Sequence, residues 1–284
     1  MSKKALLIGI NYIDSPNNKL NGCINDVINM RNILIDAYGY TAENIVILRD
    51  DLNNPSLKPT SENIIKNLIS IVSQSTSLKE IWIHYSGHGS QLMDFNGDEA
   101  DSLDEIIVPC NYKTAGIITD DMIFQIVSKS RCRTMLIFDS CNSGTVCDLT
   151  WNFNTNAQKQ IIATKTNNSA VANPNIVCLS GCRDEQSSAD IYSTFTQQYC
   201  GAMTSALIEC LRWNRHNVDI KKLYIDIVLF MTQNKFTQIP QLSSTAKTPV
   251  FQITRELTST TVAASYGSAA TAVKGAMKNI LFRR

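Results

Sequence analysis

Hydrophobic and polar positions along the chain follow two periods, and their order predicts an α/β fold. Short apolar runs typical of buried strands occur at residues 4–10, 44–48, 81–85, 135–138, 176–179 and 250–253. Apolar residues at helical spacing occur between these runs, at residues 20–37, 60–72, 120–128, 201–213 and 219–231. Because strands and helices alternate in this way, we expect a mostly parallel central sheet with helices on both faces.

Two stretches break this pattern and indicate how the chain is divided. Residues 149–173 are rich in Asn, Thr and Gln and poor in large apolar side chains, which predicts an exposed linker. The linker would join a large segment (1–148) to a small segment (174–255) of a single domain, 1–255. The last stretch, 256–284, is rich in Ser, Thr and Ala and ends in a short basic amphipathic run, so we expect a disordered tail.

Composition places the chain among soluble globular proteins. Of its 284 residues, 44% are hydrophobic and 18% are charged, and the formal net charge of +1 gives no general attraction to nucleic acid or membranes. No apolar stretch approaches the ~20 residues of a membrane span, and the first apolar run is too short for a signal peptide. We therefore expect a cytoplasmic protein with no nucleic-acid partner and no membrane span.

The nine cysteines have no repeating spacing, and without an export signal their thiols should stay reduced. Cys178 and Cys182 lie four residues apart, but the second pair of Cys or His that a zinc site needs is missing. Most of the thiols and two of the three histidines are expected to be structural residues. These residues are Cys110, Cys132, Cys147, Cys178, Cys200, Cys210, His84 and His216.

Candidate chemistry collects after two of the predicted strands, where His88 follows the run 81–85 and Cys141 follows the run 135–138. Neighbouring parallel strands bring such ends to one edge of the sheet. A catalytic cysteine needs a nearby histidine or a local positive field to form a thiolate at neutral pH, so His88 and Cys141 are the candidate catalytic pair. Gly89 lets the backbone approach a substrate carbonyl. The backbone N–H groups of Gly89 and Cys141 are therefore the expected oxyanion donors.

Six motifs occur in a fixed order along residues 4–253: Ala5–Tyr12, Leu20–Asp26, Tyr85–Ser90, Asp139–Gly144, Leu179–Asp190 and Gly201–Ala206. Together they resemble the metacaspases, a family of caspase-like cysteine proteases. The familiar caspase signature around the nucleophile is replaced here by Asp139-Ser140-Cys141. The resemblance implies a caspase-like three-layer sandwich and a cysteine endopeptidase with His88 and Cys141 as its dyad.

The resemblance also implies which residues line the primary specificity pocket, namely Cys23, Asp26, Ser86 and Asp139. Two carboxylates in a partly desolvated cleft repel each other, and a bound arginine or lysine side chain would relieve both. We therefore expect protein or peptide substrates that are cleaved after Arg or Lys rather than after Asp. The alternative for Asp26 is that it only caps or pairs on its own helix.

Calcium is the expected cofactor, because the resemblance implies a site made by Asp104, Asp120, Asp121 and Asp148. Carboxylate oxygens from separate segments suit calcium and would repel one another without it. The acidic run 94–105 partly imitates an EF-hand loop, but Glu99 stands where that loop requires glycine. We reject the EF-hand, and a solvated acidic loop is the alternative reading of this run.

Processing is expected in the linker, where Lys159 and Lys165 are basic residues in a polar stretch. Because the first predicted strand begins at residue 4, regulation by a removable front segment is not expected. No obvious dimer strand follows Ile253, which favours a monomer.

Two rival functions come from other classes. A non-catalytic caspase-like scaffold, or a calcium-responsive binding protein, would be favoured by loss of His88 or Cys141, but both residues are present. A nucleotide-binding α/β domain would need a glycine-rich phosphate loop after its first strand, where this chain has Gly9-Ile10-Asn11-Tyr12.

Overall fold

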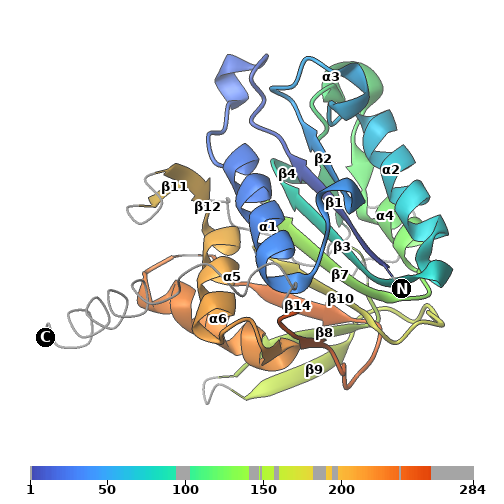
Figure 1. Cartoon of the computed structure of the whole chain (residues 1–284), viewed down its shortest axis with the longest axis vertical. Coiled ribbons are helices and arrows are strands. Elements are labelled where there is room, and N and C mark those ends of the chain that lie inside the picture. The colour runs from blue at the N-terminus through green and yellow to red at the C-terminus, as the bar shows by residue number, and fades with distance from the viewer. Residues whose placement is uncertain are drawn as a thin grey trace, which may run out of the picture.

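The computed structural model describes residues 2–93, 103–140, 147, 149–156, 160–181, 190–193, 198–236 and 238–256. An eight-stranded sheet lies at its centre (Figure 1). In spatial order its strands are β2 (Ile45–Arg49), β1 (Ser2–Gly9), β3 (Leu78–Ser86), β7 (Arg133–Asp139), β10 (Ile176–Ser180), β14 (Gln241–Ser244), β8 (Trp151–Thr155) and β9 (Ile161–Lys165). The strands from β2 to β10 are parallel, and the remaining pairs are antiparallel. The parallel strands therefore end at one common edge.

Helices cover both faces of this sheet, so the expected three-layer α/β sandwich is confirmed (Figure 1). One face carries α1 (Cys23–Tyr38), α5 (Ala202–Trp213) and α6 (Ile220–Gln233), and the other carries α2 (Ser61–Ser73), α3 (Tyr112–Ala115) and α4 (Asp120–Val127). Strand β1 is buried on both faces of the sheet. Leu7 packs in the core with α1, α5 and α6, whereas Leu6 and Ile8 pack in the core with α2 and α4. A strand that is buried on both faces reads as a continuous apolar run, which is why the sequence predicts it.

The helix ends follow local sequence signals. Thr60 and Thr119 cap α2 and α4, because each side chain accepts a hydrogen bond from a backbone N–H in the first turn. Helix α1 ends at Gly39, which has a φ of 70° in the left-handed region.

Three small sheets flank the main one. They are formed by β4 (Gly89–Met93), β5 (Leu103–Ile107) and β6 (Ile118–Thr119), by β11 (Asp190–Ser193) and β12 (Gln198–Gly201), and by β13 (Val218–Asp219) and β15 (Gln252–Ile253). Strand β4 begins directly after His88, and β12 leads directly into α5. The side-chain amide of Asn25 on α1 donates to the Tyr199 carbonyl oxygen on β12 at 2.9 Å. Strands β4 and β12 therefore lie at the same edge as the ends of the parallel strands.

The prediction of an exposed linker over residues 149–173 is wrong for two parts of that stretch. Strands β8 and β9 form an antiparallel hairpin that extends the main sheet beside β14. Phe153 is buried, and the buried Asn152 donates from its side-chain amide to Gln241 Oε1 at 2.9 Å. The segment is short of large apolar residues because its buried positions include amide side chains that bond to each other.

The last predicted strand, 250–253, is only partly correct. Residues Gln252–Ile253 form β15, which pairs with β13 and not with the main sheet. The strand that completes the main sheet is β14, whose four residues are all buried although only Leu242 is a large apolar residue. The prediction missed β14 because small polar side chains gave it no apolar run.

The described chain ends in a strap that binds to the amino-terminal edge of the sheet. Glu256, placed in the tail by sequence, donates its N–H to the Ala37 carbonyl oxygen at 2.8 Å and pairs with Lys3 at 3.1 Å. The rest of the predicted tail, 257–284, lies outside the described residues. None of the helices in the described part of the chain is both long and apolar enough to cross a bilayer.

Candidate active site

The two strand ends singled out in the sequence are neighbours in the sheet. Strands β3 and β7 pair in parallel with Ser86 opposite Asp139, and the N–H of Gly87 donates to the Asp139 carbonyl oxygen at 3.3 Å. The predicted meeting of these two strands is confirmed. Cys141 follows two residues after the end of β7 and lies outside the described residues, so its pairing with His88 stays a prediction.

His88 is fixed through its backbone and its ring. Its N–H donates to the Tyr12 hydroxyl at 2.9 Å, and its carbonyl oxygen accepts from the Tyr85 hydroxyl at 2.6 Å. The ring lies against that of Tyr12, with 4.5 Å between centroids, and Nε2 is 2.7 Å from the carbonyl oxygen of Asn18. A carbonyl oxygen only accepts, so Nε2 carries the proton and Nδ1 of a neutral ring is left as the basic nitrogen.

Tyr12 is a supporting residue to which the sequence assigned no role. Its φ of 52° lies in the left-handed region, and its hydroxyl donates to the Val108 carbonyl oxygen at 2.7 Å and lies 3.2 Å from the Tyr85 hydroxyl. Burial raises the pKa of Tyr12 well above its ordinary value, so the hydroxyl stays protonated. Gly87 makes room for this pair, because a Cβ there would stand 2.6 Å from the Tyr85 hydroxyl oxygen.

The four predicted pocket residues come together on the face of the sheet that α1 and α5 cover. Cys23 and Asp26 lie in the first turn of α1, Ser86 ends β3 and Asp139 ends β7; all four are buried. Ser86 Oγ donates to Asp26 Oδ2 at 2.6 Å. The alternative that Asp26 merely caps its own helix is wrong, because this carboxylate accepts from β3 and from the start of α5.

The start of α5 donates to both acids, a contribution that the sequence did not predict. The N–H of Gly201 lies 3.0 and 3.1 Å from the two carboxylate oxygens of Asp26, and the N–H of Thr204 donates to Asp139 Oδ2 at 2.7 Å. These amides belong to the unpaired donors of a helix amino terminus, whose dipole favours negative charge. A Cβ on Gly201 would collide with the Asp139 carboxylate, so only glycine fits this position.

The predicted calcium ligands are described only in part. Asp148 lies outside the described residues, and for Asp104, on β5, the structure describes the backbone only. Asp120 is buried at the start of α4, where its carboxylate accepts from the N–H groups of Glu105 and Asp121 at 3.1 and 2.8 Å. Within the described chain, no group of three or more potential ligands is found.

The donor chemistry at Asp120 still fits a cation. Burial raises the pKa of Asp120, while a hydrogen bond with the buried side chain of Glu105 lowers it. Two buried carboxyl groups in contact must share either a proton or a cation. Glu105 is thus a further carboxyl group beside the predicted ligands, and the sequence analysis did not select it.

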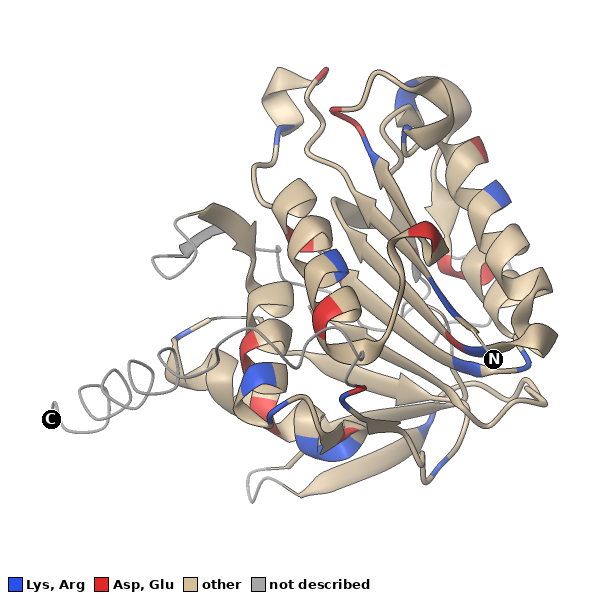
Figure 2. Ribbon diagram, in the orientation of Figure 1, with Lys and Arg blue, Asp and Glu red and all other residues tan. Residues whose placement is uncertain are grey.

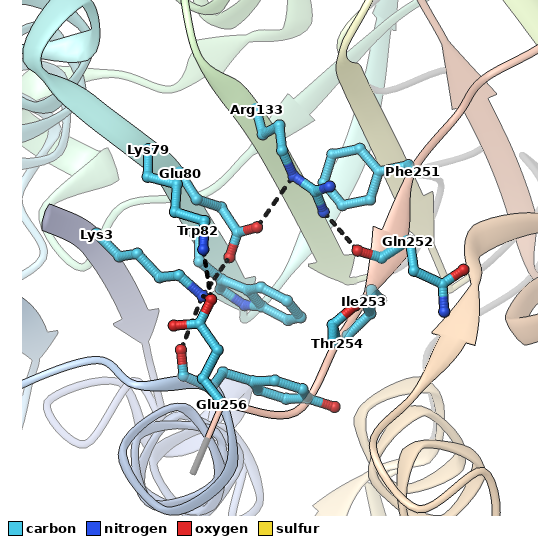
Figure 3. A pocket seen from close by; sticks show the side chains of 11 residues that line it. Lys3, Lys79, Glu80, Trp82, Arg133, Phe251, Gln252, Ile253, Thr254 and Glu256 are labelled. Atoms are coloured by element: carbon cyan, nitrogen blue, oxygen red, sulfur yellow. Dashed lines mark hydrogen bonds and ion pairs between the residues drawn. The ribbon is translucent and has the colours of Figure 1, made fainter. Parts of the chain in front are cut away.

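A cavity of about 90 Å³ lies at the opposite, amino-terminal edge of the sheet (Figure 3). Its charged side chains are bonded to one another. Arg133 Nε is 3.2 Å from Glu80 Oε2, and Lys3 contacts Glu256 at 3.1 Å. Figure 2 shows basic and acidic residues mixed over the rest of the ribbon as well. The cavity is therefore an ion-paired junction of the strap with the sheet, remote from His88.

Comparisons with known proteins agree with this arrangement. The metacaspase, peptidase C14 domain matches residues 3–150. Metacaspase-1A of Neurospora crassa is 35% identical over 85% of this chain and 62% of its own length, and Metacaspase-1 of Schizosaccharomyces pombe is 33% identical over 85% of this chain and 67% of its length. The chain thus spans about two thirds of the length of these relatives.

Two solved structures share the fold. A protein from Geobacter sulfurreducens superposes with a TM-score of 0.60 at 22% identity, covering 88% of this chain and 95% of that one. Caspase-1 from Spodoptera frugiperda gives a TM-score of 0.55 at 12% identity, covering 87% and 88%. The match of the family model over residues 3–150 and the 35% identity to a metacaspase show that the chain belongs to the metacaspase family.

Proposed function

We propose that the protein is a cysteine endopeptidase that cleaves after Arg or Lys. The observation that carries this proposal is the pair of buried acids, Asp26 and Asp139, beside the strand end that leads to His88. Family membership supports the peptidase chemistry, and the two acids support the choice of substrate.

In the proposed reaction, His88 Nδ1 accepts the proton of the Cys141 thiol while Asn18 holds Nε2–H. The thiolate attacks the substrate carbonyl carbon, and the N–H groups of Gly89 and Cys141 bind the oxyanion that forms. The protonated ring of His88 gives its proton to the leaving amine, so the peptide bond breaks and a thioester remains. Water then hydrolyses the thioester, with His88 again taking a proton, and the thiol is restored.

The charge of the pocket accounts for the proposed preference for basic residues. The donors described for the two carboxylates are the Ser86 hydroxyl and the amides of Gly201 and Thr204, which are all neutral. These bonds orient the two carboxylates for a cationic side chain. An arginine side chain would bind both acids through several N–H groups, and a lysine would meet them as a point charge.

Calcium activation is part of the proposal, with Asp104, Asp120, Asp121 and Asp148 as ligands. The contact between Asp120 and Glu105 supports it, because a bound cation would offset these buried acids. Calcium should raise the thermal unfolding midpoint of the resting protein, and Asp120→Asn should abolish that shift. Equal midpoints with calcium and with a chelator would remove calcium from the proposal.

We further propose that the protein cuts itself after Lys159 or Lys165 and acts as a monomer. The N–H of Asn156 donates to the Gln160 carbonyl oxygen at 3.0 Å beside the β8–β9 pairing, and Lys159, which precedes Gln160 in the sequence, lies outside the described residues. Strand β9 ends the main sheet, and Lys165, its last residue, is exposed. Light scattering after size-exclusion chromatography tests the monomer.

The deciding experiment compares fluorogenic peptides ending in Arg, Lys or Asp, with and without millimolar calcium, using the wild type and Cys141→Ala. Cleavage of the Arg and Lys peptides that needs both calcium and Cys141 is the expected result. Cleavage of the Asp peptide instead would overturn the specificity. Failure to cleave all three would overturn the peptidase proposal in favour of a scaffold.

A further inference from the structure

His84 is a fully buried histidine that the proposed reaction does not use. It lies on β3 two residues before Ser86, so both side chains face α1 and α5. In the register of the sheet His84 stands opposite Ile137, as Ser86 stands opposite Asp139. The imidazole therefore lies on the same face of the sheet as the Ser86–Asp139 pair, two residues nearer the amino-terminal end of β3 and under the candidate pocket.

The His84 ring reaches the pocket through one residue. Its Nε2 is 3.1 Å from Oγ1 of Thr204, and the N–H of Thr204 donates to Asp139 Oδ2 at 2.7 Å. Thr204 thus carries two contacts, one by its side chain and one by its backbone, that join His84 to the pocket acid. The hydroxyl contact restricts the Thr204 side chain and the first turn of α5 that contains it.

The other nitrogen of His84 argues against a purely structural role. Among the described residues, Nδ1 finds no hydrogen-bond partner, and it is buried. An unpaired buried nitrogen is unfavourable, and an apolar side chain would fill this position without it. In the part of the chain that the structure describes, the ring makes one polar contact, with Thr204.

The charge state of His84 suits a pocket for cations. Burial lowers the pKa of His84 to about 3, so the ring is neutral at neutral pH. A protonated ring beneath Asp139 would offset part of the negative charge that a basic substrate needs. A neutral ring supplies a hydrogen bond to Thr204 and leaves that charge in place.

We propose that His84 is a positioning residue of the primary specificity pocket, which holds Thr204 so that the Thr204 amide keeps Asp139 oriented toward a basic substrate side chain. The inference rests on the proposed cleavage after Arg or Lys. It concerns substrate binding and not the chemistry of the dyad.

The test uses His84→Leu and Thr204→Val, which remove the two partners of the contact, and Thr204→Ser, which keeps the hydroxyl. Thr134→Val is the matched control, because Thr134 is also buried and its hydroxyl lies 2.7 Å from Ser130 Oγ, near the other end of β7 and remote from the pocket. The assay measures KM and kcat for Arg and Lys peptides. It also measures the rate at which iodoacetamide alkylates Cys141, which needs no basic side chain.

We expect His84→Leu and Thr204→Val each to raise KM for both peptides about tenfold, with the alkylation rate unchanged. The double variant should be no worse than the poorer single variant, since both changes break one contact. Thr204→Ser should keep KM at the wild-type value. Thr134→Val should lower stability without changing KM. Equal effects of Thr134→Val and Thr204→Val on KM, or additive effects in the double variant, would overturn the proposal.

A second measurement separates this inference from the proposed function. Hydrogen exchange of the Thr204 amide, followed by NMR, reports the bond to Asp139 without any substrate. Faster exchange in His84→Leu, but not in Thr134→Val, supports the role of His84 even if Arg and Lys peptides are not cleaved. Unchanged exchange in His84→Leu would refute that role even in an active peptidase.

Discussion

Ser86 donates a hydrogen bond to Asp26 across 2.6 Å and thereby joins the end of β3 to the first turn of α1. Both residues are buried, so the bond forms away from water, where a bond to a carboxylate is strong. The same carboxylate accepts from the N–H of Gly201 at the start of α5. One acid therefore ties three elements together at the edge where His88 lies.

Ser86→Ala should weaken cleavage after Arg and Lys. Loss of a hydrogen bond to a charged group is worth about 1.5–3 kcal/mol, which corresponds to a roughly ten- to hundredfold fall in kcat/KM. Ser130→Ala serves as the control, because Ser130 is equally buried but bonds to Thr134 near the other end of β7. The measurement is kcat/KM for Arg and Lys peptides. A wild-type value in Ser86→Ala would show that Asp26 does not need the hydrogen bond from Ser86.

Gly201→Ala should abolish cleavage, because the added methyl group would displace the Asp139 carboxylate. The matched variant is Gly116→Ala: Gly116 has a φ of 79°, but nothing lies within 4 Å of its added Cβ. This control should lose about 1 kcal/mol of stability through backbone strain and keep its activity. Activity and thermal unfolding are measured on both variants. If both keep wild-type activity, the close approach of Gly201 to Asp139 has no functional role.

Tyr12→Phe should lower kcat about tenfold with a small change in KM, because the hydroxyl that accepts from the His88 N–H is removed. Tyr40→Phe is the control, since Tyr40 is also buried but its hydroxyl donates to Glu80 at the opposite edge, at 2.9 Å. Both variants should lose stability in urea unfolding, and only Tyr12→Phe should lose kcat. A loss of kcat in both would assign the effect to general destabilisation.

Stability should depend on His84 below neutral pH. The pKa of His84 is about 3 in the fold and ~6.5 in the unfolded chain, so between these values the unfolded chain binds a proton that the folded one does not. The contribution of His84 is therefore complete above pH ~6.5 and falls toward pH 3, by at most ~1.4 kcal/mol per pH unit. In urea unfolding, the wild type should therefore lose stability relative to His84→Leu as the pH falls from 7 to 4. A difference that is constant with pH would contradict the buried neutral ring.

The sequence predicted those parts of the fold whose apolar pattern is strong. The strands that are buried on both faces, such as β1 and β3, and the helices that pack on them are where the periodicity placed them. The pattern missed β8 and β14, because the buried Asn152 donates to Gln241 and the serines of β14 are small enough to be buried. Local periodicity contains no information about such long-range polar pairs.

The candidate site shows the same division. The family resemblance selected Cys23, Asp26, Ser86 and Asp139, and the pairing of β3 with β7 explains why Ser86 and Asp139 lie together. Gly201 and Thr204 lie in the Gly201–Ala206 motif, but they bind the two acids through backbone amides, which every residue type except proline carries, so the motif did not reveal these bonds. The sequence predicts a structural role for His84, because it does not distinguish a buried histidine that supports a pocket from one that only fills the core.

Self-cleavage should occur after Lys159 before Lys165. A peptidase binds its substrate as an extended chain with unpaired backbone groups, and Lys165 is paired with Trp151 in the β8–β9 ladder. Cutting after Lys165 therefore requires β9 to separate from β8, whereas Lys159 precedes in sequence Ile161, the first residue of β9 in the described pairing. Lys159→Ala should remove the early fragment seen by mass spectrometry, and Lys165→Ala should leave it. Cys141→Ala should stay intact throughout. An early cut after Lys165 in the wild type would mean that the hairpin opens before processing, and the same cut in Cys141→Ala would assign it to a contaminating protease.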